Sequence, residues 1–109
     1  MSYLEELFGL KSKVAVVTGG TGVLGSAMCK SLAKAGAAVV ILGRRKEAAD
    51  SLAKEIIRSG GNAIGISADV LNEQQLVNAK KLVIEKFGTI DILINCAGGN
   101  MPGAVVMPD

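Results

Sequence analysis

The chain has 109 residues, of which 50% are hydrophobic and 20% are charged, and its formal net charge is +2. This length allows one domain with a buried core, and the high apolar content argues against a disordered chain. The small net charge and the short basic clusters argue against nucleic-acid binding, and the apolar runs are too short to cross a bilayer. We therefore expect neither nucleic acid nor a membrane as a partner.

The cysteines and the start of the chain predict a cytoplasmic location. Cys29 and Cys96 are too few for a disulfide framework, so we expect reduced, buried thiols. With no histidine in the chain to activate it, Cys96 is expected to pack rather than to act as a nucleophile. No cluster of residues at metal-ligand spacing is present, so no metal is predicted. The first ten residues lack the basic start and long apolar run of a signal peptide.

The first predicted strand, Val14–Thr18, is a β-branched apolar run that stops in a glycine-rich turn before a helical pattern over residues 24–36. The turn fits the pattern G-x-G-x-x-G, with a strand before it and an amphipathic helix after it. Glycines let the backbone approach a pyrophosphate, and the first N–H groups of the helix point at the anion. The alternative is a tight turn that binds nothing. The candidate cofactor-binding residues here are Gly19, Gly20, Thr21, Gly22, Val23, Leu24 and Gly25.

The second predicted strand, Ala38–Leu42, is followed by Arg44 and Arg45 and then by a helical pattern over residues 46–59. A carboxylate at this place would bind the ribose hydroxyls of NAD, but the sequence has two guanidinium groups instead. Arginine suits a ribose 2′-phosphate because it forms charge-assisted bidentate hydrogen bonds. NADP is therefore predicted as the preferred cofactor, with NAD possible. The alternative is that both arginines are solvated cations at a helix start.

The third predicted strand, Ala63–Ser67, is followed by Asp69 and Val70, and a helical pattern over residues 72–87 begins with a capping-box arrangement. In open α/β sheets ligands bind at the carboxyl edge of the strands. Asp69 is therefore a candidate acceptor for the adenine amino group, and Val70 a candidate neighbour of the ring. The alternative is that Asp69 only shapes a turn or caps the helix.

The fourth predicted strand, Ile90–Asn95, ends at the same edge. Asn95, Ala97 and Gly98 are candidate cofactor-binding residues, because small residues let the chain pass beneath a ribose and nicotinamide. The alternative is a polar strand terminus with a glycine turn. The tail from Gly98 to Asp109 contains two prolines and is predicted to be a loop.

Alternating strands and helices predict the α/β class, with a Rossmann-type doubly wound parallel sheet in the order 3-2-1-4. The fourth strand then lies at an exposed edge, although its apolar sequence is typical of a sheet interior. The sheet is therefore expected to be incomplete. We interpret residues 1–109 as one NAD(P)-binding domain, truncated before a catalytic segment or completed by another chain.

These motifs together resemble the short-chain dehydrogenase/reductase family. Thr18, Gly19 and Gly25 match its pattern T-G-x-x-x-G-x-G, but the middle glycine of that pattern falls on Val23, and this chain has Gly22 instead. The family signature N-N-A-G appears as Asn95-Cys96-Ala97-Gly98. Asp69 matches the adenine-binding aspartate, and Arg44 the position where basic residues accompany NADP.

The resemblance implies reversible hydride transfer between NADP(H) and a polar carbonyl or alcohol, and a homo-oligomeric full-length protein, a dimer or tetramer. The glycine turn and the residues after Ala97 look like the branch of D-mannonate oxidoreductases, or fructuronate reductases; gluconate 5-dehydrogenase-like and 3-oxoacyl reductase-like members are alternatives. The catalytic Ser and Tyr-x-x-x-Lys of the family follow the fourth strand, so no catalytic residue is assigned, and the 109-residue chain is expected not to turn over substrate. The alternatives outside the family are a non-catalytic nucleotide-binding or oligomer-completing module and, ranked last, an interaction domain without nucleotide.

Overall fold

The structure is a computed structural model that describes residues 12–96 and 103–106. Five strands form one sheet in the order β3-β2-β1-β4-β5. The first four strands are parallel, so the predicted α/β class and the strand order 3-2-1-4 are confirmed. The strands are β1 (Val14–Thr18), β2 (Ala38–Gly43), β3 (Asn62–Ser67), β4 (Ile92–Asn95) and β5 (Gly103–Val106).

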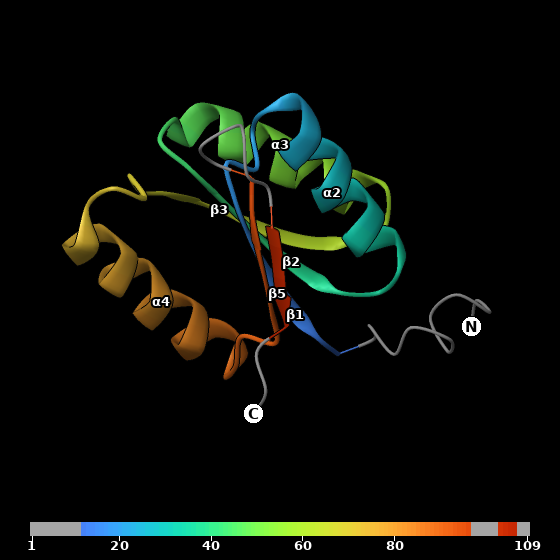
Figure 1. Cartoon of the computed structure of the whole chain (residues 1–109). Helices are drawn as coiled ribbons and strands as arrows, with labels where there is room; N and C mark the ends of the chain where they lie inside the picture. Colours follow the sequence, from blue (N-terminus) through green and yellow to red (C-terminus); the bar gives the residue numbers. More distant parts are fainter. Residues whose placement is uncertain (1–11, 97–102, 107–109) are drawn as a thin grey trace.

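Three helices cover the two faces of this sheet (Figure 1). Helices α2 (Val23–Lys34) and α3 (Lys46–Arg58) pack on one face, and α4 (Glu73–Phe87) lies on the other. Each helix buries its small and apolar residues against the strands. The central strands β1 and β2 are buried on both faces, as expected inside a parallel sheet, whereas β3 and β4 are partly exposed. The result is two core layers, one beneath α2 and α3 and one beneath α4.

The fifth strand corrects one expectation from the sequence. Residues 103–106 were predicted to be loop because prolines stand nearby, but they pair antiparallel with β4, Gly103 opposite Asn95 and Val106 opposite Ile92. The N–H and C=O groups on the outer edge of β4 need partners, and this short stretch contains no proline and supplies them. The fourth strand is therefore not the edge of the sheet. The other residues of the tail lie outside the described part of the chain.

The strand register brings all parallel strand ends to one edge of the sheet. Thr18 of β1 is paired with Leu42 of β2 and with Asn95 of β4, and Gly43 of β2 is paired with Ser67 of β3. Strand β4 begins at Ile92, two residues later than predicted, and Asp91 before it contacts β1: its Oδ2 accepts from the N–H of Val14 at 2.8 Å, and its own N–H donates to Val14 O at 2.9 Å. The residues that follow each strand therefore come together along a single edge.

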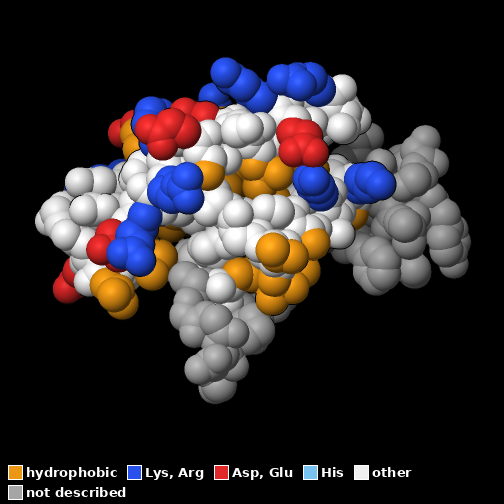
Figure 2. Space-filling model, turned by 90° about the horizontal axis from the view of Figure 1, so that it is seen from above, with side chains coloured by type: hydrophobic (Ala, Val, Ile, Leu, Met, Phe, Trp, Pro, Cys, Tyr) orange, Lys and Arg blue, Asp and Glu red, His pale blue; other side chains and the backbone are white. Residues whose placement is uncertain are grey.

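The surface over α2 and α3 carries lysine, arginine and acidic side chains side by side (Figure 2). One cross-helix ion pair lies here, between Lys30 of α2 and Glu55 of α3, with Nζ and Oε1 3.0 Å apart. Both side chains are exposed, so the pair contributes little to stability. None of the helices in residues 12–96 has the length and apolar character that a membrane span needs.

Candidate dinucleotide-binding site

A cleft of about 1260 Å³ opens along the carboxyl edge of the sheet on the side of α4. Residues of α4 and of the turn that follows it form one wall, and most of the remaining lining comes from the turn after β1, the segment after β2, the segment after β3 and the end of β4. These four segments are distant in sequence and meet only because the strands are parallel. The predicted site residues that line the cleft are Gly19, Thr21, Arg44, Arg45, Asp69, Val70 and Asn95.

The turn after β1 is held to the end of β2 by backbone hydrogen bonds. The N–H groups of Gly19 and Gly20 both donate to the carbonyl oxygen of Leu42, at 2.9 and 3.3 Å. The N–H of Gly22 then donates to Gly19 O at 3.2 Å, which closes the turn. Gly19 has a φ of 67°, in the left-handed region where glycine is favoured. The turn is thus fixed before any ligand arrives.

The glycines of this turn serve different purposes. A Cβ at Gly25 would collide with the carbonyl of Gly19 and come within 2.7 Å of Gly20 Cα, so this glycine is required for the helix to pack against the turn. At Gly22 the backbone is extended, with φ −75° and ψ 175°, and a Cβ would meet only Gly19 O at 3.6 Å. The fold itself therefore tolerates a side chain at position 22.

The first turn of α2 has free hydrogen-bond donors. Its first helical hydrogen bond runs from Ser26 N to Gly22 O, so the N–H groups of Val23, Leu24 and Gly25 precede the helical ladder. No side chain caps the helix, and its first turn contains no acidic residue. Together with the helix dipole, these donors form an arrangement that suits an anion.

Arg44 and Arg45 follow β2 beside this turn. Neither forms an ion pair with another residue in the described part of the chain, whereas the neighbouring Lys46 is paired with Asp50 at 3.2 Å. The backbone of Arg44 is fixed, because Ser67 Oγ donates to its carbonyl oxygen at 3.1 Å. Two guanidinium groups therefore lie along the cleft with their donors available.

The segment after β3 forms a tight turn around Asp69. Its Oδ1 accepts from the N–H of Leu71 at 2.9 Å, and its own N–H donates to Gln75 Oε1 at 2.7 Å. The turn role that the sequence left open for Asp69 is thus present in the structure. Its second oxygen, Oδ2, accepts no hydrogen bond from the described residues.

Asn95 is held by the strand beside it. Thr18 Oγ1 donates to Asn95 Oδ1 at 2.8 Å, and the N–H of Cys96 donates to Thr18 O at 2.9 Å. This pair fixes the point where β4 leaves the sheet, next to the start of the glycine turn. Ala97 and Gly98, also predicted as site residues, lie outside the described residues.

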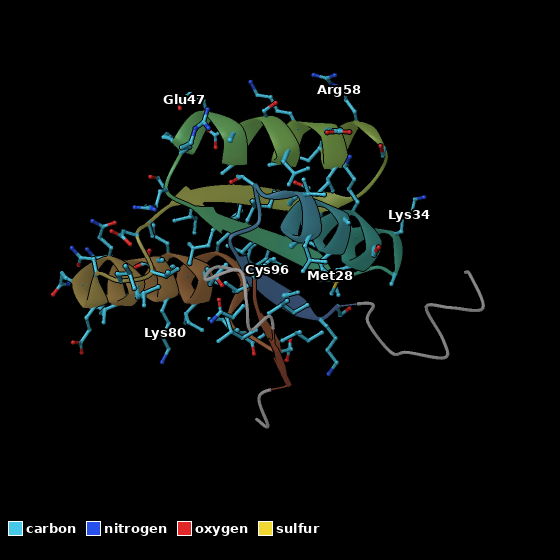
Figure 3. All side chains as sticks on the ribbon, turned by 45° about the horizontal axis from the view of Figure 1, so that its top comes forward. Met28, Lys34, Glu47, Arg58, Lys80 and Cys96 are labelled. Carbon is cyan, nitrogen blue, oxygen red and sulfur yellow. The ribbon has the colours of Figure 1, made fainter. Side chains whose placement is uncertain are left out.

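The two cysteines lie on the opposite face of the sheet from the cleft. Cys29 of α2 is fully buried, and Met28 and Cys96, labelled in Figure 3, pack against the same cluster. Burial, and to a smaller extent the neighbouring Cys96, raises the pKa of the Cys29 thiol from 9.0 to about 12. Cys29 is therefore a neutral packing residue. It lies close beneath the turn after β1, since a Cβ on Gly20 would be 3.3 Å from its sulfur.

Among the further residues that line the cleft and that the sequence did not indicate are Gly43, Leu71 and Lys80. A Cβ on Gly43 would lie 3.3 Å from Thr21 Cγ2, so this glycine lets the turn after β1 lie close to the end of β2. Because Gly43 directly precedes the predicted site residue Arg44, its position in the sequence could have predicted that it lines the cleft. Lys80 comes from the middle of α4, and only the tertiary fold brings it to the cleft.

Comparison with known proteins agrees with this architecture. The family model for short chain dehydrogenases matches residues 13–107. The chain belongs to the short-chain dehydrogenase family. It is 48% identical over 96 residues to the uncharacterized oxidoreductase UxuB of Bacillus subtilis, an alignment that covers 88% of this chain and 34% of that protein. The chain thus spans about a third of the length of the curated relatives it matches.

Two solved short-chain dehydrogenase structures show cofactors. A candidate D-mannonate oxidoreductase from Haemophilus influenzae, with bound NAD, is 43% identical with a TM-score of 0.80, over 85% of this chain and 33% of that one. A metagenomic short-chain oxidoreductase in complex with NADP is 31% identical with a TM-score of 0.73, over 77% of this chain and 38% of that one. Members with either cofactor therefore share this fold.

Proposed function

We propose that this chain is the dinucleotide-binding part of an oxidoreductase of the short-chain dehydrogenase family. The observation that carries the proposal is the uncapped head of α2, where three N–H groups follow a turn whose Gly22 has room that the fold itself does not need. A diphosphate fits both features, because it accepts hydrogen bonds from helix N-terminal donors and needs close approach to the backbone. The residues proposed to hold it run from Gly19 to Gly25.

The proposed cofactor is NADP. Arg44 and Arg45 lie along the cleft without carboxylate partners in the described part of the chain, and no acidic residue stands between β2 and α3. A ribose 2′-phosphate would supply the missing anion. NAD is the second candidate, because the Haemophilus influenzae relative was solved with NAD. On either cofactor we assign the adenine end to Asp69 and Val70, and the nicotinamide end to Asn95, Ala97 and Gly98.

The proposed reaction of the full-length protein is hydride transfer between NADP(H) and a polar carbonyl or alcohol. The nicotinamide cofactor supplies or accepts the hydride when bound, and a proton donor is needed at the carbonyl oxygen. This chain contributes the binding of the cofactor and the fixed position of its ring. A sugar acid of the D-mannonate or fructuronate type is the proposed substrate, supported by the name of the Haemophilus influenzae relative.

Calorimetric titration of the chain with NADP and with NAD tests the cofactor proposal. We expect tighter binding of NADP, and we expect Arg44→Asp to reverse the preference, because a carboxylate repels the 2′-phosphate and accepts from the 2′-hydroxyl of NAD. Arg58→Asp, at the far end of α3, is the matched control with the same change of charge. A clear preference of the unchanged chain for NAD would overturn the assignment of NADP.

An activity assay separates the binding part from the whole enzyme. The 109-residue chain mixed with NADPH and fructuronate is expected to show no oxidation of NADPH, and appreciable turnover would contradict the assignment of catalysis to another segment. A non-catalytic nucleotide-binding module is the second candidate function. It predicts that a longer version of the chain also lacks turnover. The homo-oligomeric state and the cytoplasmic location stay predictions, which size-exclusion chromatography and cell fractionation check.

A further inference from the structure

Strand β3 is the last strand on its side of the sheet, and its outer edge is not protected. It pairs only with β2, in continuous register from Asn62 to Ser67 and without a bulge. Its six residues include no charged side chain and no proline. Bulges, charges and prolines are the features with which proteins commonly block an edge strand. The outer edge of β3 is therefore open to another strand.

The backbone groups of Gly65 and Ser67 face this outer edge. The N–H of Ala68 donates to Gly43 O at 2.9 Å, so the backbone of residue 68 is directed toward β2. Successive residues of a strand direct their N–H and C=O groups to alternate sides, so those of Ser67 and Gly65 are directed away from β2. Ser67 is exposed and Gly65 is partly exposed. These two residues offer donors and acceptors that β2 does not use.

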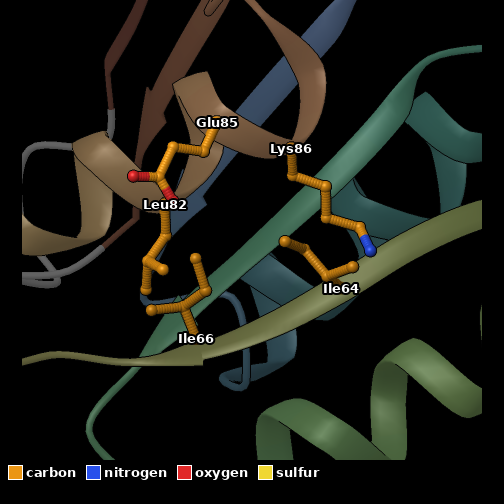
Figure 4. Close-up of a pocket in the computed structure, with 5 residues that line it drawn as sticks. All are labelled: Ile64, Ile66, Leu82, Glu85 and Lys86. Carbon is orange, nitrogen blue, oxygen red and sulfur yellow. The ribbon is translucent and has the colours of Figure 1, made fainter.

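An apolar hollow lies beside this edge, between β3 and α4. It is lined by Ile64, Ile66, Leu82, Glu85 and Lys86 (Figure 4). The side chain of Leu82 is 52% exposed, although it lies over two isoleucines. None of the five residues lines the dinucleotide cleft. An apolar surface is thus available next to open strand hydrogen-bonding groups, and burial of such a surface drives protein association.

The charges at this hollow indicate what covers it. Glu85 and Lys86 are both exposed, and the two ion pairs of the described residues involve neither of them. In Figure 4, Lys86 extends past Ile64, whereas Leu82 approaches Ile66. The hollow therefore carries opposite, unpaired charges next to each other, with the positive charge toward one isoleucine.

A twofold axis makes this surface complementary to itself. When two β3 strands pair antiparallel with Gly65 opposite Gly65, Ile64 of each copy lies opposite Ile66 of the other. Lys86 of each copy is then on the side of Glu85 of the other copy, so the unpaired charges meet with opposite sign. The same symmetry brings the two apolar hollows together.

We propose that the β3 edge and the hollow beside it bind a second copy of this chain. The two sheets join edge to edge through antiparallel β3 strands, and Leu82 of each copy is covered at the interface. Hydrogen bonds of Gly65 and Ser67 hold the strands together, and the pairing of Glu85 with Lys86 selects the antiparallel twofold arrangement. This interface is independent of the proposed cofactor, because the hollow and the cleft share no residue.

Charge reversal tests the interface, with sedimentation velocity as the measurement of dimerisation. Glu85→Lys and Lys86→Glu should each weaken the dimer at least about tenfold, because like charges then face each other twice across the axis. The double variant, with both substitutions, should restore the dimer. Lys81→Glu is the matched control, since it makes the same change of charge in α4 outside the hollow. It should leave dimerisation unchanged.

Amide hydrogen exchange tests the strand pairing itself. The amides of Gly65 and Ser67 should become protected as the concentration of the unchanged chain rises, because each then donates to the other copy. In Lys86→Glu this dependence on concentration should disappear. A dimer in which these two amides exchange as fast as in the monomer would refute pairing through β3.

Two further outcomes would overturn the proposal. One is a chain that stays monomeric up to about 1 mM, which corresponds to a negligible affinity. The other is a dimer that both single variants keep, or that the double variant does not recover, since either result assigns the contact to another surface. Thermal melting of each variant checks that the fold is retained.

Discussion

Helices α2 and α4 both begin at the carboxyl edge of the sheet, but their first turns are built differently. Helix α4 is capped by its own chain: Asn72 Oδ1 accepts from Gln75 N at 3.1 Å, and Glu73 places a negative charge in the first turn. Helix α2 starts at Gly22 with no side-chain cap and no acidic residue in its first turn. In α4 a side chain accepts from one of the N-terminal donors, and in α2 no side chain does.

This difference makes the start of α2 the better place for an anion than the start of α4. A side-chain cap contributes about 1 kcal/mol to a helix relative to alanine but only a few tenths relative to glycine, so the Gly22 N-cap of α2 gives up little stability. The rest of α2 follows ordinary rules, since it buries Cys29 and Leu32 and carries Lys34 in its last turn. The missing cap therefore supports the proposed anion site at the start of α2. A phosphate at this position would supply the negative charge that Glu73 supplies in α4.

The largest expected effect comes from removing the close packing at the head of α2. Gly25→Ala should destabilise the fold by about 3 kcal/mol, because its Cβ collides with the backbone of Gly19 and Gly20. Denaturant unfolding measures this change. Gly22→Ala is the matched control, and its Cβ has room, so it should change stability by less than about 1 kcal/mol. Equal losses in the two variants would contradict the division of roles between these glycines.

The next effect comes from giving α2 the cap of α4. Gly22→Asn fits the extended backbone at this position and should leave stability equal or slightly higher, because asparagine caps a helix better than glycine. The new side chain occupies the donors and the space proposed for the diphosphate. We expect the affinity for NADP to fall at least about tenfold, or 1.4 kcal/mol, in a calorimetric titration. A variant that caps the helix and still binds NADP with unchanged affinity would contradict the proposed diphosphate site at the start of α2.

The converse change removes the cap of α4. Asn72→Ala should lower the free energy of unfolding by about 1 kcal/mol, because the N–H of Gln75 loses its acceptor. The affinity for a phosphate at α2 should not change. Unfolding and NADP titration of the same sample check both statements. If the variant gained phosphate binding at the start of α4 despite the negative charge of Glu73, an uncapped helix end alone would be sufficient for phosphate binding.

The smallest effect at neutral pH concerns the buried thiol of α2. Because burial raises the pKa of Cys29 from 9.0 to about 12, the folded state binds more protons than the unfolded state between these values. Stability should therefore be constant with respect to this group below pH 9.0 and should fall as the pH rises toward about 12. Chemical unfolding across this range, with Cys29→Ala as control, measures the slope. An identical slope in the variant would exclude Cys29 as its source.

Local patterns were sufficient for much of the fold. The strand before Gly19, the helix start after Gly22 and the cap at Asn72 depend on neighbours within a few residues, and each was predicted close to its observed place. The capping box was only half correct, because Gln75 Oε1 accepts from Asp69 N and not from Asn72 N. Strand β5 was missed because its pairing depends on the free edge of β4, which the tail sequence does not reveal.

The site was predictable where residues directly follow a strand. Arg44 and Asp69 were found in this way, since the carboxyl ends of parallel strands share one edge. Leu71 and Lys80 were not, because exposure on a cleft wall is a property of the tertiary structure. The sequence shows that this chain has Gly22 where the family pattern places its middle glycine at position 23, but it does not show whether the fold needs that glycine. Only the backbone geometry separates Gly25, which the fold requires, from Gly22, which the fold does not.

An amide NMR titration of the isotope-labelled chain with NADP shows whether the uncapped start of α2 holds the diphosphate. We predict that the largest shifts fall on the amides from Thr21 to Gly25 and on Arg44 and Arg45, while the amides of Ser59 to Gly61, just beyond the far end of α3, move much less. Unchanged amides at the head of α2 in the presence of saturating NADP, or shifts confined to the rest of the surface, would contradict it.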